Sequence, residues 1–312
     1  MKTCISIDLD NFEDYRSLVD PRGDPTGPSF YAAVPRFLDA LDAAGARATF
    51  FAIGRDARSP AHRRTLREIA ARGHEVGNHS HTHPYDFSRL SRARKREEVA
   101  SAEGALADAV GERPVGFRVP SGDVDGETHE ILAERGYRYD ASLTPSPLLW
   151  LFMLYGRRYV ERAGYRLGRP AYALAPARPY LPRAGKPHRS RAATGDGPAL
   201  LEIPISVVPG IGIPFYGTLL RRLGARSFDL LTRLHPRSRP LHVGFHALDL
   251  MDLRGTSLGR ALARCPGLSV PFERRERFID HAFRRLACLG ESVPLRELAD
   301  AFLERGGLRR AA

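Results

Sequence analysis

Short strand-like runs alternate with helix-like segments through the first half of the chain, and this alternation narrows the possible folds more than any other feature. The runs TCISIDL, RATFFAI and PVGFRVP have the length and the β-branched or aromatic content of buried strands. The segments 30–46 and 62–73 carry apolar residues at helical spacing and end at or near a glycine. Because strand–helix units with short links form a parallel sheet covered by helices, we expect an α/β fold.

The regular pattern is interrupted once. Ser91 has the position of an N-cap for a helix that ends near Gly111, and further elements follow up to residue 143. From 144 to 198, Pro, Arg, Gly and Tyr dominate and no period holds. We therefore expect one domain over residues 1–312 with an irregular insertion at 144–198. Within the insertion we expect an apolar helix at 146–158 and a mobile loop at 180–198.

The pattern resumes after the insertion. The segments ALLEIPISVV and PLHVGFHALDL are strand-like, and two amphipathic helices follow at 272–290 and 294–306.

Charge and cysteine content limit the partners. The net charge is +12, which would suit nucleic acid, a phospholipid surface or a phosphate-bearing substrate. The positive charge is mostly arginine spread along the chain, with no compact basic motif, so no nucleic-acid partner is expected. Three widely spaced cysteines suggest reduced thiols, and the N-terminus has no secretory signal pattern. The reduced thiols favour a cytoplasmic location. The longest apolar run, 148–155, is far shorter than the ~20 residues that span a bilayer.

Two acids close the first predicted strand. Asp8 and Asp10 are two residues apart, so in an extended chain they share a face. One could bind a metal while the other accepts a proton. Acids after a strand are also common as loop residues or helix caps, and the pair alone does not decide between these alternatives.

Three histidines stand within five residues after the strand-like HEVGN. His79 and His83 are four apart and could converge on one ion if the segment forms a helical turn, with His81 pointing elsewhere. The alternative is a solvated polar loop. Two histidines and one aspartate form a common catalytic set for a divalent metal with positions left for water.

Further polar residues follow other predicted strands. Arg118 could hold a carboxylate through a bidentate contact, and Asp140 and His246 each end a strand. His242 shares a face with His246 but lies deeper, where a structural role is expected. Each residue could instead be a cap or a satisfied core residue.

The succession SIDLD, ATFFAIG, HEVGNHSHTH, GFRVPSG, YDASL and VGFHALD resembles the polysaccharide deacetylases with a NodB-type domain, the carbohydrate esterase family 4 enzymes and their relatives. The resemblance covers about 2–142 and 200–302. The D-x-D opening is similar to the branch that includes formamido-arabinose–phosphoundecaprenol deformylases. The resemblance implies a distorted (β/α)7 barrel, here with the long irregular insertion.

The resemblance also implies residue roles. Asp10, His79 and His83 would bind one divalent metal, usually Zn²⁺, with Co²⁺, Mn²⁺, Ni²⁺ or Fe²⁺ as alternatives. Asp8 would be the general base, oriented by Arg118 with help from Asp140. His246 would be the general acid. The family often continues its last motif with Pro–Trp where this chain has HALDL, and the gap between Asp8 and Asp10 leaves their roles open to exchange.

The expected reaction is hydrolysis of a non-peptide carbon–nitrogen bond that removes an acetyl or formyl group from an amino sugar. The sugar could lie in a glycan or in a lipid-linked or nucleotide-linked precursor of a cell-envelope glycan. The segments 148–158 and 207–224 pair apolar residues with arginine and could touch an anionic membrane, line a cleft or belong to the core.

Two alternatives remain open. The first is a hydrolase of a non-sugar amide. The second is a catalytically silent protein that binds a glycan or a membrane, which predicts the loss of at least one site residue, although all are present.

Overall fold

A curled parallel sheet forms the centre of the computed structural model, which describes residues 1–19, 22, 26–149, 151, 168–192, 200–263 and 269–305. The sheet has eight strands in the order β10-β1-β2-β3-β4-β5-β8, and β9 also pairs with β1. Every pairing in it is parallel, which confirms the expected α/β fold and the distorted barrel. The strands are β1 (Lys2–Asp8), β2 (Ala48–Ala52), β3 (Glu75–Asn78), β4 (Gly116–Phe117), β5 (Tyr139–Asp140), β8 (Leu201–Glu202), β9 (Leu241–His246) and β10 (Glu291–Ser292).

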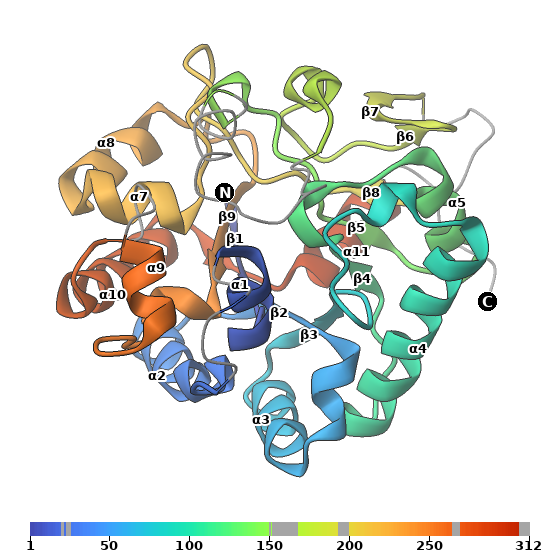
Figure 1. Ribbon diagram of the computed structural model, residues 1–312. Coiled ribbons are helices and arrows are strands. Elements are labelled where there is room, and N and C mark those ends of the chain that lie inside the picture. The colour runs from blue at the N-terminus through green and yellow to red at the C-terminus, as the bar shows by residue number, and fades with distance from the viewer. Residues whose placement is uncertain are drawn as a thin grey trace.

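Helices surround this sheet (Figure 1). Ser91 caps the helix Arg92–Val110 (α4) as expected, since its hydroxyl accepts from the backbone N–H of Arg94, and Gly111 ends this helix with φ 85°. The helices are α1 (Phe12–Val19), α2 (Val34–Ala44), α3 (Pro60–Ala71), α4 (Arg92–Val110), α5 (Gly126–Glu134), α7 (Gly217–Leu223), α8 (Ala225–Leu234), α9 (Ser257–Ala263), α10 (Phe272–Leu289) and α11 (Leu295–Arg305).

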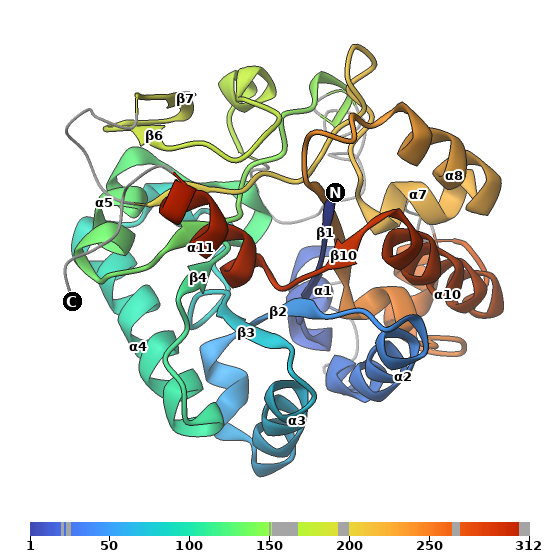
Figure 2. The same cartoon turned by 180° about the vertical axis from the view of Figure 1, so that it is seen from behind.

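The two ends of the barrel differ. From behind, α11 lies across the side where β1 begins, near β10 (Figure 2). Leu295 and Leu298 of this helix pack with Cys4, Phe51 and Tyr139 in one buried cluster. The amino end of the barrel is thus closed by apolar contacts, which leaves the carboxyl ends of the strands for polar groups.

The strand register aligns those carboxyl ends. Asp8 lies opposite His246 on β9, and Asn78 of β3 lies opposite Phe117 of β4. The residues that follow, His79 and Arg118, therefore leave the sheet at the same level. Side chains distant in the sequence meet at one edge for this reason.

The insertion contains more regular structure than the sequence suggests. In its described part, β6 (Pro182–Arg183) and β7 (Lys186–Ser190) form an antiparallel hairpin within the segment expected to be a mobile loop. A 3₁₀ turn spans Pro170–Leu174. The predicted helix at 146–158 falls mostly outside the described residues. Among the residues that the structure describes, no helix has the length and apolarity to span a bilayer.

Candidate metal centre and active site

A cavity of about 300 Å³ opens at the carboxyl edge of the sheet. Its wall includes both acids of the first strand, both outer histidines of the His79–His83 segment, and the arginine and histidine that follow later strands. These are Asp8, Asp10, His79, His83, Arg118 and His246. The structure thus brings six of the seven predicted site residues to one cavity.

Asp10, His79 and His83 converge. Asp10 Oδ1 lies 3.1 Å from His79 Nε2 and 3.4 Å from His83 Nε2. The Nδ1 atom of His79 is 2.7 Å from the carbonyl oxygen of Arg118, and because a carbonyl only accepts, Nδ1 carries the proton. The lone pair of His79 Nε2 is then directed at Asp10. One ligating atom from each residue lies within 4.8 Å of the other two.

The three side chains fit a divalent metal. His83 is buried, yet neither of its ring nitrogens has a hydrogen-bond partner in the described structure. An unbonded imidazole beside a carboxylate is an unfavourable arrangement that a bound cation would relieve. Burial raises the pKa of Asp10, but His83 and His79 outweigh it and hold that pKa well below its usual range. Asp10 is therefore an anion available for a cation.

The histidines converge from a loop and not from the helical turn that the sequence offered as one way to bring them together. Ser80 and His83 have φ of 64° and 57°, in the left-handed region that non-glycine residues seldom occupy. Side chains hold this shape, since Asn78 accepts from the Ser80 N–H and the Ser80 hydroxyl accepts from the His83 N–H. The turn aims both outer histidines inward, and His81 lies outside the cluster.

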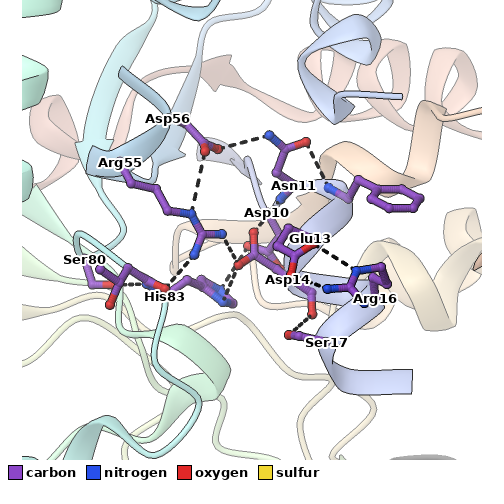
Figure 3. Close-up of polar contacts among 12 residues, drawn as sticks. Asp10, Asn11, Glu13, Asp14, Arg16, Ser17, Arg55, Asp56, Ser80 and His83 are labelled. Atoms are coloured by element: carbon purple, nitrogen blue, oxygen red, sulfur yellow. Dashed lines mark hydrogen bonds and ion pairs between the residues drawn. The ribbon is translucent and has the colours of Figure 1, made fainter. Parts of the chain in front are cut away.

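Asp14 was not identified from the sequence. It lies on α1, one helical turn after Asp10, and Figure 3 shows it between Arg55 and His83. Its Oδ1 forms an ion pair with Arg55 and lies 3.6 Å from His83 Nδ1, and its Oδ2 accepts from the N–H of Asn11. The i, i+4 spacing of two aspartates after a strand was the signal available.

Asp8 has different neighbours. Arg118 Nη1 donates to Asp8 Oδ1 at 2.6 Å, while Asp8 Oδ2 is 3.8 Å from His246 Nε2. Burial lowers the pKa of Arg118, but Asp8 outweighs it, so that pKa is raised. This geometry favours Asp10 as metal ligand and Asp8 as the proton acceptor over the exchanged assignment.

Asp140 does not support Arg118 in the expected way. It bonds His129 and Ser142, and the described residues include no hydrogen bond or ion pair between Asp140 and Arg118. Arg118 instead donates to the carbonyl oxygen of Ala141, next in the chain to Asp140.

Residues around His246 complete the wall. The Tyr216 hydroxyl lies 3.4 Å from His246 Nε2, and Tyr15 packs edge-on against the His246 ring. Asp249 accepts from the His246 N–H and pairs with Arg221, which gives a structural role to an acid of the unusual HALDL sequence. Neither tyrosine was identified from the sequence, because loop contacts of this kind leave no short motif.

Comparisons with known proteins agree with this geometry. Residues 26–139 match the family model described as polysaccharide deacetylase. A chitooligosaccharide deacetylase of Bradyrhizobium sp. (strain ANU 289) is 39% identical over 98 residues, which cover 31% of this chain and 42% of that protein. A peptidoglycan-N-acetylglucosamine deacetylase of Bacillus cereus is 30% identical over 90 residues, 29% of this chain and 32% of that protein. The chain thus spans less than half the length of these curated relatives.

A solved structure matches over the whole chain. The putative polysaccharide deacetylase from Mycobacterium smegmatis superposes with a TM-score of 0.61 and 21% identity, covering 100% of this chain and 92% of that one. At this identity the match shows the fold. The two comparisons agree: residues 26–139 match the polysaccharide deacetylase family model, and the fold over the whole chain is that of a structure described as a putative polysaccharide deacetylase.

Proposed function

We propose that this protein is a metal-dependent hydrolase that removes an N-acyl group, acetyl or formyl, from an amino sugar. The convergence of Asp10, His79 and His83 in one cavity with Asp8 and His246 carries the proposal. The names of the relatives add support, because both describe deacetylases of amino sugars.

Asp10, His79 and His83 would hold the metal. A divalent ion bound there supplies a Lewis acid, which polarises the amide carbonyl and makes water a better nucleophile at neutral pH. Zn²⁺ is the ion we propose, since two imidazoles and one carboxylate are typical zinc ligands.

Asp8 and His246 would move the protons. Arg118 donates a charge-assisted hydrogen bond to one oxygen of Asp8, which leaves the other oxygen to accept a proton from the attacking water. An amine leaves only after protonation, and His246 Nε2, on the cavity wall, would deliver that proton. The Tyr216 hydroxyl would orient the same ring nitrogen.

Variants separate the two groups of residues. We expect His79→Ala or His83→Ala to lose metal and activity together. Asp8→Asn and His246→Ala should keep the metal and lose turnover by about 10²–10⁴-fold, the usual contribution of one acid–base group. Metal content and the release of acetate or formate from N-acylated sugars measure both effects.

His81→Ala is the matched control, because His81 belongs to the same loop but not to the metal cluster. It should keep metal and most activity. Full metal content and activity in His79→Ala would refute the ligand assignment. Intact turnover in Asp8→Asn would refute the proton pathway.

We propose that the sugar belongs to a precursor bearing a phosphate, either lipid-linked or nucleotide-linked. The cavity is at the small end of ligand sites, a size that suits one sugar unit. The insertion contributes Leu149, Tyr172 and the exposed Arg169 to its wall. A guanidinium at that position matches a phosphate beside the sugar. Such a substrate would place the reaction in the synthesis of a cell-envelope glycan.

We also propose peripheral membrane contact at the cytoplasmic face, through a surface on α7 and α8. Leu223, Leu230 and Leu234 are 42%, 56% and 48% exposed on these consecutive helices. The same two helices carry exposed arginines between or next to these leucines, namely Arg222, Arg226 and Arg233. Leucines that enter the headgroup region beside arginines that meet phosphates are a membrane-surface pattern.

Vesicle flotation tests this contact. The double variant Leu230→Glu, Leu234→Glu should abolish co-flotation with vesicles that contain anionic phospholipid, because it removes apolar area and adds two negative charges. Arg64→Glu on α3 changes the net charge equally, lies on a different side of the barrel (Figure 1) and should float like the unaltered protein. Equal flotation of all three would remove the membrane proposal.

The organisation as one domain with an insertion at 144–198 also stands as our proposal. Strands β5 and β8, which flank the insertion, pair directly with each other. The chain therefore leaves the sheet and returns to the adjacent position.

A further inference from the structure

A second polar cluster lies outside the lining of the cavity. His129 comes from α5, Asp140 from β5 and Glu202 from β8, and all three side chains are buried. The strand register sets Asp140 directly opposite Glu202. Two carboxylates side by side in a buried sheet repel each other, so something must compensate their charge.

Each carboxylate has one oxygen fixed and one directed at a common point. Ser142 Oγ donates to Asp140 Oδ1 at 2.6 Å, and the Leu143 N–H donates to Glu202 Oε1 at 3.0 Å. The other oxygens face His129 Nε2, with Asp140 Oδ2 at 2.9 Å and Glu202 Oε2 at 3.7 Å. In metal sites, a neutral donor often bonds the carboxylate oxygen that does not bind the metal and so orients the carboxylate. Ser142 and the Leu143 N–H have this position at Asp140 and Glu202.

The Glu202 Oε2 atom indicates that the cluster could bind a ligand. This atom is buried and has no hydrogen-bond partner in the described structure, and neither has His129 Nδ1. Arg118 acts on Glu202 electrostatically, but its guanidinium bonds Asp8 and the Ala141 carbonyl. Burial, and then the adjacent Asp140, raise the pKa of Glu202 well above its usual range.

We propose that His129, Asp140 and Glu202 bind a second divalent transition-metal ion, which joins α5, β5 and β8. One ligand atom from each residue lies within 4.8 Å of the other two. One imidazole and two carboxylates suit Zn²⁺ or Mn²⁺ better than Ca²⁺ or Mg²⁺, which favour oxygen alone. None of the three residues lines the cavity of the candidate active site, so the ion's role is structural.

Metal stoichiometry tests the proposal. The full chain is stripped with a chelator, loaded with excess Zn²⁺, freed of unbound ion and analysed for zinc per chain. We expect two ions in the unaltered protein, one in His83→Ala, one in Glu202→Gln and none when both changes are combined. Glu202→Gln keeps the shape and the oxygen that accepts from Leu143 while removing the charge.

Glu75→Gln is the matched control, because Glu75 is also a buried glutamate of the sheet but bonds Thr49 and Tyr139. It should retain two ions. One ion in the unaltered protein and none in His83→Ala would overturn the proposal and mean that protons compensate the two carboxylates. This outcome needs no Glu202 variant and holds even if that variant does not fold. Two ions without amide hydrolysis would refute only the proposed function.

Discussion

His83 is the most constrained residue of the candidate active site. Its backbone is left-handed, its side chain is 1% exposed, and it lies between the carboxylates of Asp10 and Asp14. Asp14 faces Nδ1 while Asp10 faces Nε2, so the two acids define opposite sides of one ring. A carboxylate on the far side of a ligating imidazole fixes its tautomer and increases its basicity.

Asp14→Asn should therefore weaken zinc affinity by about 10–100-fold while the fold is retained. The amide keeps the size of the carboxylate but removes the charge next to His83 Nδ1 and the ion pair with Arg55. Zinc affinity measured by competition with a chromophoric chelator reports the change. Glu13→Gln, on the same helix, is the control, because Glu13 is exposed and pairs with Arg16, away from His83. Equal affinity in both variants would exclude Asp14 from the metal centre.

At this scale the sequence predicted the residues that belong to short motifs. Asp8, Asp10, His79 and His83 lie within five residues of a partner of the same kind, and the structure brings all four together. Tyr216 and Glu202 could not be identified in this way, because they meet the site only through pairing of distant strands and loops. Asp140 is the opposite case, because its position at the end of a strand was predicted but its partner was not. It bonds His129 instead of Arg118.

The strands were predicted well where they are long and poorly where they are short. β1 pairs with three strands, and its sequence is a buried apolar run that predicts a strand clearly. β4, β5 and β8 have only two residues each, which is too short for a recognisable pattern. The expected strand at 199–208 continues beyond β8 as single bonds, from the Ile205 N–H to Leu143 and from the Ser206 N–H to His242. The segment after β8 thus spans the gap between β8 and β9. Its residues keep the apolar pattern of a strand but do not form a continuous row of strand hydrogen bonds.

Gly116 tests how tightly β4 is placed. A Cβ at this position would overlap the ring of Tyr139 on β5, whose hydroxyl donates to buried Glu75. We expect Gly116→Ala to destabilise the protein by about 1–3 kcal/mol through overpacking, measured by denaturant unfolding. Gly104→Ala on α4 meets no atom within 4 Å and should stabilise by about 0.5–1 kcal/mol. The same sign for both variants would contradict this packing.

For the molecule as a whole, the barrel separates an apolar end from a polar end, and His242 lies between them. Its Nδ1 faces the Pro204 carbonyl, so the proton is there, and Nε2 faces Ser6 Oγ and Arg118. The sequence placed His242 below His246 by strand periodicity. It could not show that His242 contacts the arginine that holds Asp8, because that contact depends on the curvature of the closed sheet.

This placement predicts a pH-dependent stability. Burial, and then Arg118, lower the pKa of His242 to about 3 from an ordinary value of 6.5. The unfolded chain gains a proton at this residue below about pH 6.5 while the folded chain does not. The contribution of His242 to the free energy of unfolding is therefore complete above pH 6.5. It is lost as the pH falls toward 3, by about 1.4 kcal/mol per pH unit for one proton.

His242→Gln removes the titrating ring and keeps an acceptor for Arg118. We expect the unfolding free energy of this variant to lie below that of the unaltered protein at pH 7, and the difference to shrink as the pH falls to 4.5. Ser6→Ala is the control, because it removes one partner of His242 Nε2 but keeps the titrating ring. The difference in unfolding free energy between Ser6→Ala and the unaltered protein should therefore remain nearly constant with pH. A constant difference for His242→Gln across this range would mean that His242 gains its proton at the same pH in the folded and unfolded chain, which would contradict its burial beside Arg118.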